Sequence, residues 1–434
     1  MKISKNEKSL IMAKKFFNKN NVIYFDEHYY LYNEGIWRME SDENTEGWIM
    51  EEYIKQHAEP PTPMQVRDIA KFISMYTFSE YRKQIKYFND EIRDNTINIK
   101  SGILNLDTLE IKPYTKKSFC FYKLPFDYIP DPYCPVMIDF ISSSMGFDKD
   151  ISNSLDEDRD EYFKVVYFIQ EWLGYSMLAN YKLEKSLLMV GEGANGKSVL
   201  QDIWQHIIGR YNCSFVDLKY INDGSQVFMT RNKLVNFSKD LENNQQLDTG
   251  IVKSFVSGQI VNCNEKFKAQ TEMSAVAKIV IACNELPYIK NPSNSVKRRF
   301  HILPFNIVFS EDQQDKHLLE KLIKEDEHIF SWAVNGLKRL KKRGYFDVPT
   351  RCKYSMRSYI KENDTIELWL EDYEIHHDRY KTEMVKAYNS YKVYCYESGM
   401  KAYGKSKFYK RLELKGYKKH RTGGKNYFLN MFVE

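Results

Sequence analysis

The sequence predicts an α/β protein with a parallel-sheet core, an α+β domain before it and a domain of two helices and a hairpin after it. Three observations support this class. Between residues 181 and 345, short apolar runs of strand length alternate with segments of helical periodicity. Residues 1–135 mix β-type runs with helical patterns, and residues 346–434 change to a basic, Tyr-rich composition. Residues 136–180 form a helical lead-in to the core.

The composition predicts a soluble protein and argues against a membrane protein, a secreted protein and a structural zinc protein. A chain of 434 residues with 43% hydrophobic and 28% charged residues is ordinary for a protein of about two to four soluble domains. It has no apolar run of transmembrane length and no signal-peptide core, so we expect a cytoplasmic protein without membrane contact. The seven cysteines are dispersed, which favours free thiols and argues against structural zinc.

The net charge of +5 is unevenly distributed along the chain. Residues 381–434 contain 13 Lys and Arg against four Glu, a net charge of +9, so the preceding residues sum to −4. A basic C-terminal segment rich in Tyr and Phe is typical of a protein that binds a polyanion.

The first 135 residues are predicted to form a small α+β domain without chemistry of its own. Three short β-type runs separated by turn residues indicate a β-meander: 22–25, 29–32 and 36–39. Two helical segments follow, and then strands around a turn at Gly102: 48–57, 63–88 and 95–111. Three prolines within residues 127–135 indicate a linker.

The lead-in, 136–180, has helical patterning and contains the acidic run 156–161. Such a run can suggest a metal site, but acidic residues are also favoured at a helix N-terminus, and we adopt that interpretation. The aromatic-rich helix that follows, 162–178, leads into the first strand of the core.

Residues 191–198 read Gly-Glu-Gly-Ala-Asn-Gly-Lys-Ser, the pattern of a phosphate-binding loop. A strand-like apolar run precedes the loop, and a segment with helical spacing follows it. Backbone N–H groups at a helix N-terminus cradle phosphates, the lysine bridges their oxygens and the serine hydroxyl ligates Mg²⁺. The sequence therefore predicts a site for ATP and Mg²⁺, with Lys197 as a catalytic residue. Its cofactor-binding residues are Gly191, Gly193, Ala194, Asn195, Gly196, Lys197, Ser198 and Val199.

Two further strands are expected to bring polar side chains to this loop. Asp240 and Glu242 follow the strand-like run 233–238, at the end where doubly wound sheets place active residues. We assign Asp240, together with Ser198, to the metal, and leave open which of Asp240 and Glu242 activates water. Asn284 follows the next strand-like run, where an amide beside the γ-phosphate can orient the attacking water.

The basic run Lys297-Arg298-Arg299 comes shortly after Asn284. A guanidinium placed at the γ-phosphate of a neighbouring subunit stabilises transition-state charge, as arginine fingers do. The sequence predicts such a finger here and leaves Arg298 and Arg299 as alternatives. A surface basic cluster is the other interpretation of this run.

Residues 259–272 alternate polar and apolar side chains around a tip that contains Lys266, Phe267 and Lys268. Two cations and an aromatic ring at a hairpin tip suit single-stranded DNA, because they neutralise phosphates and stack on bases. We predict that this tip binds DNA, with an ordinary hairpin as the alternative.

The C-terminal residues predict a winged-helix domain. One helix is indicated by apolar residues at helical spacing: Met384, Tyr388, Tyr391 and Cys395. A second helix spans 405–415, and a hairpin around Gly423-Gly424 follows; the helix can enter a major groove while the hairpin meets phosphates. The DNA-binding candidates are Lys405, Lys407, Lys410, Arg411, Lys418, Lys419, Arg421 and Lys425. A solvated basic face and a protein-binding surface remain the alternatives.

In this order, the pieces resemble superfamily 3 helicases, the replication helicases of phages, plasmids and pathogenicity islands that are related to those of poxviruses and papillomaviruses. The resemblance covers most of the chain and is strongest over residues 165–305. The matching segments are 174–175, 191–198, 236–242, 253–258, 265–267, 282–287 and 297–300. Two departures are Gln259, where many relatives carry Asp, and Lys239-Asp240, where many carry paired acids.

The resemblance implies an AAA+-like ATPase that assembles as a ring, expected to be a hexamer, with ATP between subunits and the arginine supplied in trans. It also implies that the hairpin lines a central channel and tracks one DNA strand with 3′-to-5′ polarity. Relatives often carry an N-terminal primase, but residues 1–135 show no primase-like acidic constellation, so we predict a helicase without a primase.

We therefore expect an ATP-dependent DNA helicase that initiates replication of a mobile genetic element. Its expected partners are DNA, further copies of the chain and host replication proteins. Two alternatives stay open. A DNA-binding ATPase switch would melt or mark an origin without translocating, and a small-molecule phosphotransferase would use the same loop without responding to DNA.

Overall fold

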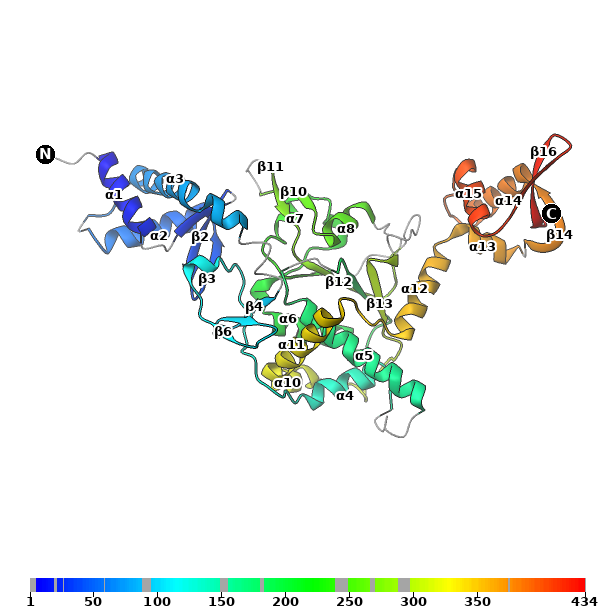
Figure 1. The fold of residues 1–434 in the computed structure, drawn as a ribbon, viewed down its shortest axis with the longest axis horizontal. Coiled ribbons are helices and arrows are strands. Elements are labelled where there is room, and N and C mark those ends of the chain that lie inside the picture. The colour runs from blue at the N-terminus through cyan, green and yellow to red at the C-terminus, as the bar shows by residue number, and fades with distance from the viewer. Residues whose placement is uncertain are drawn as a thin grey trace.

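The structure is a computed structural model and describes residues 5–18, 22–25, 27–57, 59–87, 95–148, 155–179, 183–238, 249–265, 270–287, 297–373 and 375–433. Its elements form three groups along the long axis of the molecule (Figure 1). The N-terminal and C-terminal groups lie at opposite ends, and the group around the parallel sheet lies between them. Among the described residues, no helix has the length and apolar character needed to cross a membrane.

A three-stranded antiparallel sheet, β1–β2–β3, organises the N-terminal group. Its strands are β1 (Val22–Phe25), β2 (His28–Asn33) and β3 (Ile36–Glu40), which confirms the predicted meander. The helices that pack against it are α1 (Lys5–Asn18), α2 (Asp42–Ile54) and α3 (Pro63–Tyr87). The sequence did not predict α1, because lysines interrupt its apolar residues. The apolar faces of the sheet and the helices share one buried cluster.

A second antiparallel sheet follows, with the order β4–β5–β6. Its strands are β4 (Thr96–Asn98), β5 (Ile103–Asn105) and β6 (Ile111–Lys112). The turn at Gly102 is confirmed, and a Cβ there would lie 2.4 Å from Lys112 O, so glycine is required by the close approach. Ile97 and Leu104 are fully buried in the cluster formed by the central helices, so this sheet packs with the central group.

The central sheet has five parallel strands in the order β13–β7–β12–β9–β8. The strands are β7 (Ser186–Val190), β8 (Cys213–Ser214), β9 (Val235–Ser238), β12 (Lys278–Cys283) and β13 (Phe300–Pro304). This confirms a mixed α/β core, and the sequence predicted β7, β9 and β12. It missed both edge strands, because β8 has only two residues and β13 joins a basic run to a proline.

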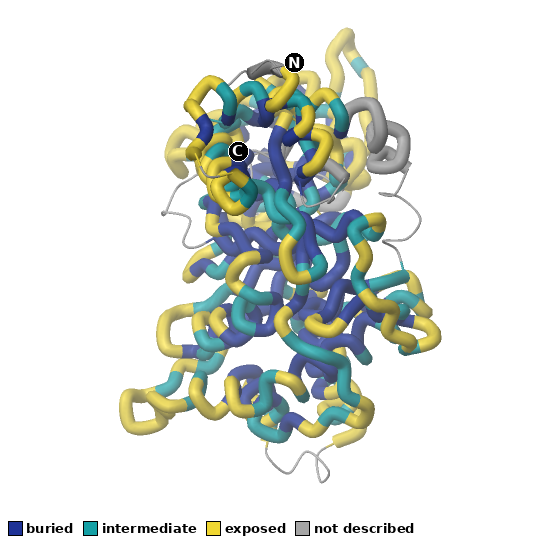
Figure 2. Tube along the Cα trace, turned by 90° about the vertical axis from the view of Figure 1, so that its left-hand side faces the viewer, coloured by how far each residue is buried: buried dark blue, intermediate teal, exposed yellow. Residues whose placement is uncertain are grey.

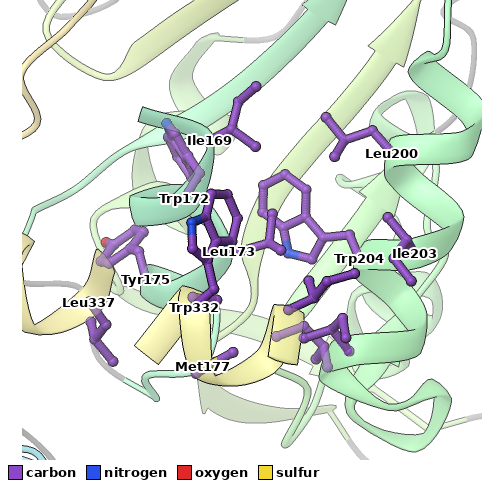
Figure 3. Packing of buried hydrophobic residues seen from close by; sticks show 14 of the residues in the cluster. Ile169, Trp172, Leu173, Tyr175, Met177, Leu200, Ile203, Trp204, Trp332 and Leu337 are labelled. Atoms are coloured by element: carbon purple, nitrogen blue, oxygen red, sulfur yellow. The ribbon is translucent and has the colours of Figure 1, made fainter. Parts of the chain in front are cut away.

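The central helices enclose the largest apolar cluster of the described chain, in which Trp172, Trp204 and Trp332 gather (Figure 3). These helices are α4 (Pro135–Ser144), α5 (Asp156–Tyr175), α6 (Lys197–Ile208), α10 (Leu318–Ile323) and α11 (Asp326–Arg343). Figure 2 shows the buried residues in the interior of the molecule and the exposed residues around its outside. The acidic run begins α5, which confirms it as a helix N-terminus. The sequence predicts helical structure over residues 306–345, and α10 and α11 lie there, but residues 306–317 form no helix.

The chain between β8 and β12 forms a hairpin and two short helices. The hairpin consists of β10 (Ile260–Asn264) and β11 (Gln270–Ser274), as the sequence predicted. The helices are α7 (Gly224–Phe228) and α8 (Thr249–Val256). Elsewhere, single 3₁₀ turns span Lys116–Ser118 and Arg210–Asn212, and a third, Leu218–Tyr220, lies between β8 and α7. The hairpin and α7 lie on the side of the sheet that faces away from α10 and α4 (Figure 1).

The C-terminal group has its own buried cluster, separate from that of the central group. Helix α12 (Thr350–Glu362) packs on β13 and leads into this group. The elements beyond it are α13 (Thr365–Asp372), β14 (His376–Glu383), α14 (Met384–Glu397), α15 (Lys405–Leu414), β15 (Lys419–Thr422) and β16 (Lys425–Met431). This confirms the two predicted helices and the hairpin, whereas α12, α13 and β14 were not predicted.

Helices α5 and α11 cross at two glycines. A Cβ on Gly174 would lie 2.4 Å from Ala333 O and 2.8 Å from Leu337 N, and one on Gly336 would lie 2.6 Å from Gln170 Cγ. The helix backbones come this close because the contact residues lack side chains.

Gly174→Ala is expected to destabilise the protein by about 2 kcal/mol, because the added methyl group meets backbone atoms of a packed helix. Gly47 lies inside α2 with nothing within 4 Å of its Cβ position, so Gly47→Ala should stabilise the protein by about 0.5–1 kcal/mol. Thermal unfolding of both variants measures these effects. An unchanged melting temperature for Gly174→Ala would contradict the close crossing.

Candidate nucleotide-binding site

The loop between β7 and α6 lies against α4 and against the chain that follows β13. Gly196, directly before α6, has a φ of 92°, and a Cβ there would lie 2.6 Å from Ser144 Oγ of α4. Ala194 also has a positive φ, 55°, and its carbonyl oxygen accepts a hydrogen bond from Phe309 N at 2.8 Å. The loop is therefore held in a left-handed, glycine-dependent conformation at the N-terminus of α6.

The ammonium group of Lys197 curls back over this loop. Its Nζ donates to Gly191 O at 2.5 Å, to Glu192 O at 2.8 Å and to Asn195 Oδ1 at 3.1 Å. The side chain is nearly buried, with 6% of its residue surface exposed. The positive charge of Lys197 is thus held next to the N-terminus of α6, where backbone N–H groups and the helix dipole also favour an anion.

A cavity of about 940 Å³ opens over the loop. Helix α4 forms one wall, and the segment 309–321 contributes another. Lys197, Ser198 and Asn284 all line it, so the structure gathers these three predicted residues around one space. The predicted cofactor-binding residues line it too, with the exception of Gly191.

Two buried polar atoms of residues that line this cavity have no hydrogen-bond partner among the described residues. They are Ser144 Oγ of α4 and Gln201 Nε2 of α6, in residues that are only 1% and 3% exposed. Buried polar groups in proteins are nearly always hydrogen-bonded, so these two atoms call for a polar ligand or water in the cavity. Sequence reasoning missed this wall, although three consecutive serines at the end of an apolar helix, 142–144, were an available signal.

The two predicted carboxylates, Asp240 and Glu242, lie outside the described residues. The strand before them, β9, runs parallel to β12 and pairs with it, so both strands end at the edge where Asn284 lies. Within the described residues, no group of three His, Cys, Asp or Glu side chains is arranged to hold a metal ion. Of the two predicted metal ligands, Ser198 and Asp240, Ser198 is the one within the described residues, and it lines the cavity.

The two candidate arginines occupy different environments. Arg299 is buried, with Nη2 3.2 Å from Glu184 Oε2 and 2.9 Å from Ser257 Oγ, and its Nε also donates to Ser257 Oγ. Arg298 is exposed, and neither arginine lines the cavity of its own chain. Burial, together with the charges of Arg298 and Arg299, lowers the pKa of the neighbouring Lys185.

The predicted DNA-binding residues fall into three sets: those outside the described residues, those that are exposed, and those that pair with acidic residues. Lys266, Phe267 and Lys268 lie outside the described residues. In the C-terminal group, five of the predicted DNA-binding residues are exposed: Lys405, Lys407, Lys410, Lys418 and Arg421. The others pair with acids of the same group: Arg411 with Asp364, Lys419 with Glu413, and Lys425 with Glu383. Arg411 was expected to face outward, but it packs against α13 because Asp364 caps that helix there.

Comparisons of sequence match part of the chain. Residues 189–299 match the model of a family of unknown function, DUF5906. The chain is 23% identical over 206 residues to Putative helicase 184R of Invertebrate iridescent virus 6 and 22% identical over 162 residues to Putative helicase L207/L206 of Acanthamoeba polyphaga mimivirus. These segments cover 42% and 36% of this chain but only 21% and 17% of the two relatives. Part of the chain is therefore similar to proteins named as helicases.

Comparisons of structure match nearly the whole chain. Two apo structures of the NrS-1 C-terminal region superpose with TM-scores of 0.53 and 0.54, at 12% and 10% identity. They cover 97% and 98% of this chain, and 98% and 99% of those chains. At this level of identity the likeness concerns the fold, and it extends over all three groups of elements.

Proposed function

We propose that the chain is an ATP-driven DNA helicase of the superfamily 3 type, which works as a ring, expected to be a hexamer, and initiates replication of a mobile genetic element. The observation that carries this proposal is the cavity over the β7–α6 loop, with Lys197 fixed at its mouth and unpaired polar atoms in its wall. The similarity to two viral proteins named as helicases supports the choice of a motor over a small-molecule phosphotransferase.

In this proposal the loop and α6 bind the triphosphate of ATP through backbone N–H groups, and Lys197 moves from the loop carbonyls to the phosphate oxygens. Ser198 and Asp240 hold Mg²⁺, which neutralises charge on the β- and γ-phosphates when bound. Hydroxyl and carboxylate oxygens are ligands that suit this ion. Asn284 and one of Asp240 and Glu242 orient and activate the attacking water.

The arginine that completes the site comes from the neighbouring copy of the chain, and we assign this role to Arg298. Arg299 is engaged by Glu184 and Ser257 of its own chain, whereas Arg298, next to it, is exposed and available to another subunit. Arg299 then acts as a positioning residue that fixes the start of β13 and the backbone of Arg298.

DNA binding is assigned to two places. The tip of the β10–β11 hairpin contacts the translocated single strand, with 3′-to-5′ polarity. The C-terminal group acts as a winged helix, in which α15 offers Lys405, Lys407 and Lys410 to duplex DNA while the hairpin offers Lys418 and Arg421. Host replication proteins are expected partners, and the cytoplasm is the expected site of action.

ATP hydrolysis with and without single-stranded DNA, on protein sized by mass photometry, tests the proposal. We expect turnover by a ring-sized species that DNA stimulates, together with strand separation of a forked duplex. Stimulated turnover without strand separation would favour an origin-melting switch instead. DNA-independent turnover by a monomer would contradict both and favour a phosphotransferase.

A further inference from the structure

The N-terminal sheet contacts the β10–β11 hairpin at the end next to its tip. His28, the first residue of β2, is 4% exposed, and its Nε2 donates to Glu265 Oε2 at 3.2 Å. Glu265 directly follows Asn264, the last residue of β10, and directly precedes Lys266 of the proposed DNA-binding tip. A residue near the start of the chain therefore touches the element that we assign to DNA.

This contact belongs to a wider interface. The His28 ring lies 5.4 Å from the ring of Phe228, the last residue of α7. Asn232 Nδ2 donates to Tyr30 Oη at 3.3 Å, and the Arg38 guanidinium lies 5.2 Å from the centre of the Tyr211 ring. The N-terminal sheet thus contacts residues 211–232 of the central group through side chains of β2 and β3, beside the hairpin.

Helix α7 holds the hairpin from another direction. A Cβ on Gly224 would lie 2.2 Å from Asn264 Oδ1 and 3.3 Å from Asn264 N, so the first residue of α7 lies directly against the end of β10. The two neighbouring residues at the base of the tip, Asn264 and Glu265, are therefore contacted by α7 and by the N-terminal sheet respectively.

The hairpin depends on its packing against other elements for its position. Only Cys263 in β10 and Met273 in β11 are buried, and the other residues of both strands are exposed or half-buried. An isolated two-stranded hairpin is marginally stable in water, so its packing against other elements decides where it lies.

The same region is hydrogen-bonded to the central sheet. Ser238 Oγ accepts from Leu218 N at 3.1 Å, and Asn236 Oδ1 accepts from Val216 N at 2.9 Å, with both side chains fully buried. Both acceptors belong to β9, the strand that leads to the proposed catalytic carboxylates. Contacts therefore join β9 of the central sheet to the segment before α7, and α7 to the tip end of the hairpin.

We propose that the N-terminal sheet is a clamp that fixes the β10–β11 hairpin against α7, with His28 as its positioning residue. The consequence for DNA rests on the proposed function, since it requires the hairpin tip to contact the strand. With the clamp in place, the hairpin moves together with the central sheet and does not pivot independently. Movement of the central sheet that nucleotide causes is then transmitted through the hairpin to DNA.

Hydrogen exchange of the full-length protein tests the clamp without DNA or ATP. His28→Ala should speed exchange of the amides in β10 and β11 by about fivefold, the change that corresponds to one ordinary hydrogen bond. Glu265→Ala should also speed this exchange, and the effect of the double variant should be smaller than the sum of the two, because both changes remove the His28–Glu265 contact. His57→Ala is the matched control, since the His57 ring contacts Tyr53, near the end of α2, and His57 follows that helix. Exchange equal to the wild type in His28→Ala would overturn the clamp.

Coupling of hydrolysis to strand separation tests the positioning role. His28→Ala should lower the number of base pairs separated per ATP by about threefold to tenfold while basal hydrolysis stays at the wild-type rate. His28→Gln should restore much of the coupling, because its amide can donate to Glu265. Faster exchange with unchanged coupling would overturn the positioning role. A wild-type protein that hydrolyses no ATP would instead contradict the proposed function, and exchange would still decide the clamp.

Discussion

Lys197→Ala is expected to reduce ATP hydrolysis by at least about 100-fold, as expected when a preorganised charge on the reacting phosphate is removed. The physical reason is the position of the ammonium group, which the loop holds over the N-terminus of α6 at 2.5 Å from Gly191 O and 2.8 Å from Glu192 O. No other described lysine contacts these loop carbonyls in the structure. Steady-state hydrolysis and binding of a fluorescent ATP analogue measure the effect.

Lys164→Ala provides a matched control for this variant. Lys164 is a lysine on the outer face of α5 that pairs with Asp160, and it lies outside the cavity. Its removal should leave hydrolysis unchanged, and both variants should bind duplex DNA like the wild type, because the basic residues of the C-terminal group are untouched. Hydrolysis retained by Lys197→Ala would place the nucleotide elsewhere in the chain.

Local sequence patterns predicted the part of the site that is contiguous in the chain. The strand–loop–helix unit around residues 186–208 follows from an apolar run, a glycine pattern and helical spacing, all of which are short-range signals. The positions of β9 and β12 beside it follow from the same apolar runs. Each of these features depends on residues that are close together in sequence.

Features that depend on distant residues could not be predicted in the same way. Arg298 and Arg299 are identical side chains at adjacent positions, and their difference arises from Glu184 and Ser257, which lie 115 and 42 residues from Arg299 in the chain. Arg411 looks like any outward-facing arginine of a helix until Asp364, 47 residues earlier, is placed beside it. The pairing of these charges is set by the fold and leaves no periodic trace in the sequence.

The wall of the cavity illustrates the same limit. Segment 309–321 contributes several lining residues and has no regular structure before α10, so it has no helical or strand periodicity to detect. The docking of β4–β6 on the central cluster is equally hidden, because short strands such as Ile103–Asn105 fit either an independent domain or an extension of the core.

Arg298→Ala is expected to lower ATP hydrolysis by about 10³-fold in the assembled ring, the lower end of the effect of an arginine finger. Because Arg298 is exposed, the variant should retain the wild-type melting temperature. Arg299→Ala should differ in this respect, since it leaves Glu184 and Ser257 without their partner and should cost about 1–3 kcal/mol of stability. Arg298→Lys should remain impaired, because an ammonium group cannot reproduce the planar guanidinium.

Mixing two inactive variants separates a finger in trans from one in cis. In rings formed from equal amounts of Arg298→Ala and Lys197→Ala, about a quarter of the head-to-tail interfaces combine an intact loop from one copy with an intact arginine from the other. Hydrolysis should therefore recover to about that fraction of the wild-type rate, although each variant alone is inactive. A mixture that stays inactive despite forming rings would mean that Arg298 acts within its own chain. It would also remove the reason for ATP hydrolysis to depend on assembly, because every copy would then carry a complete site.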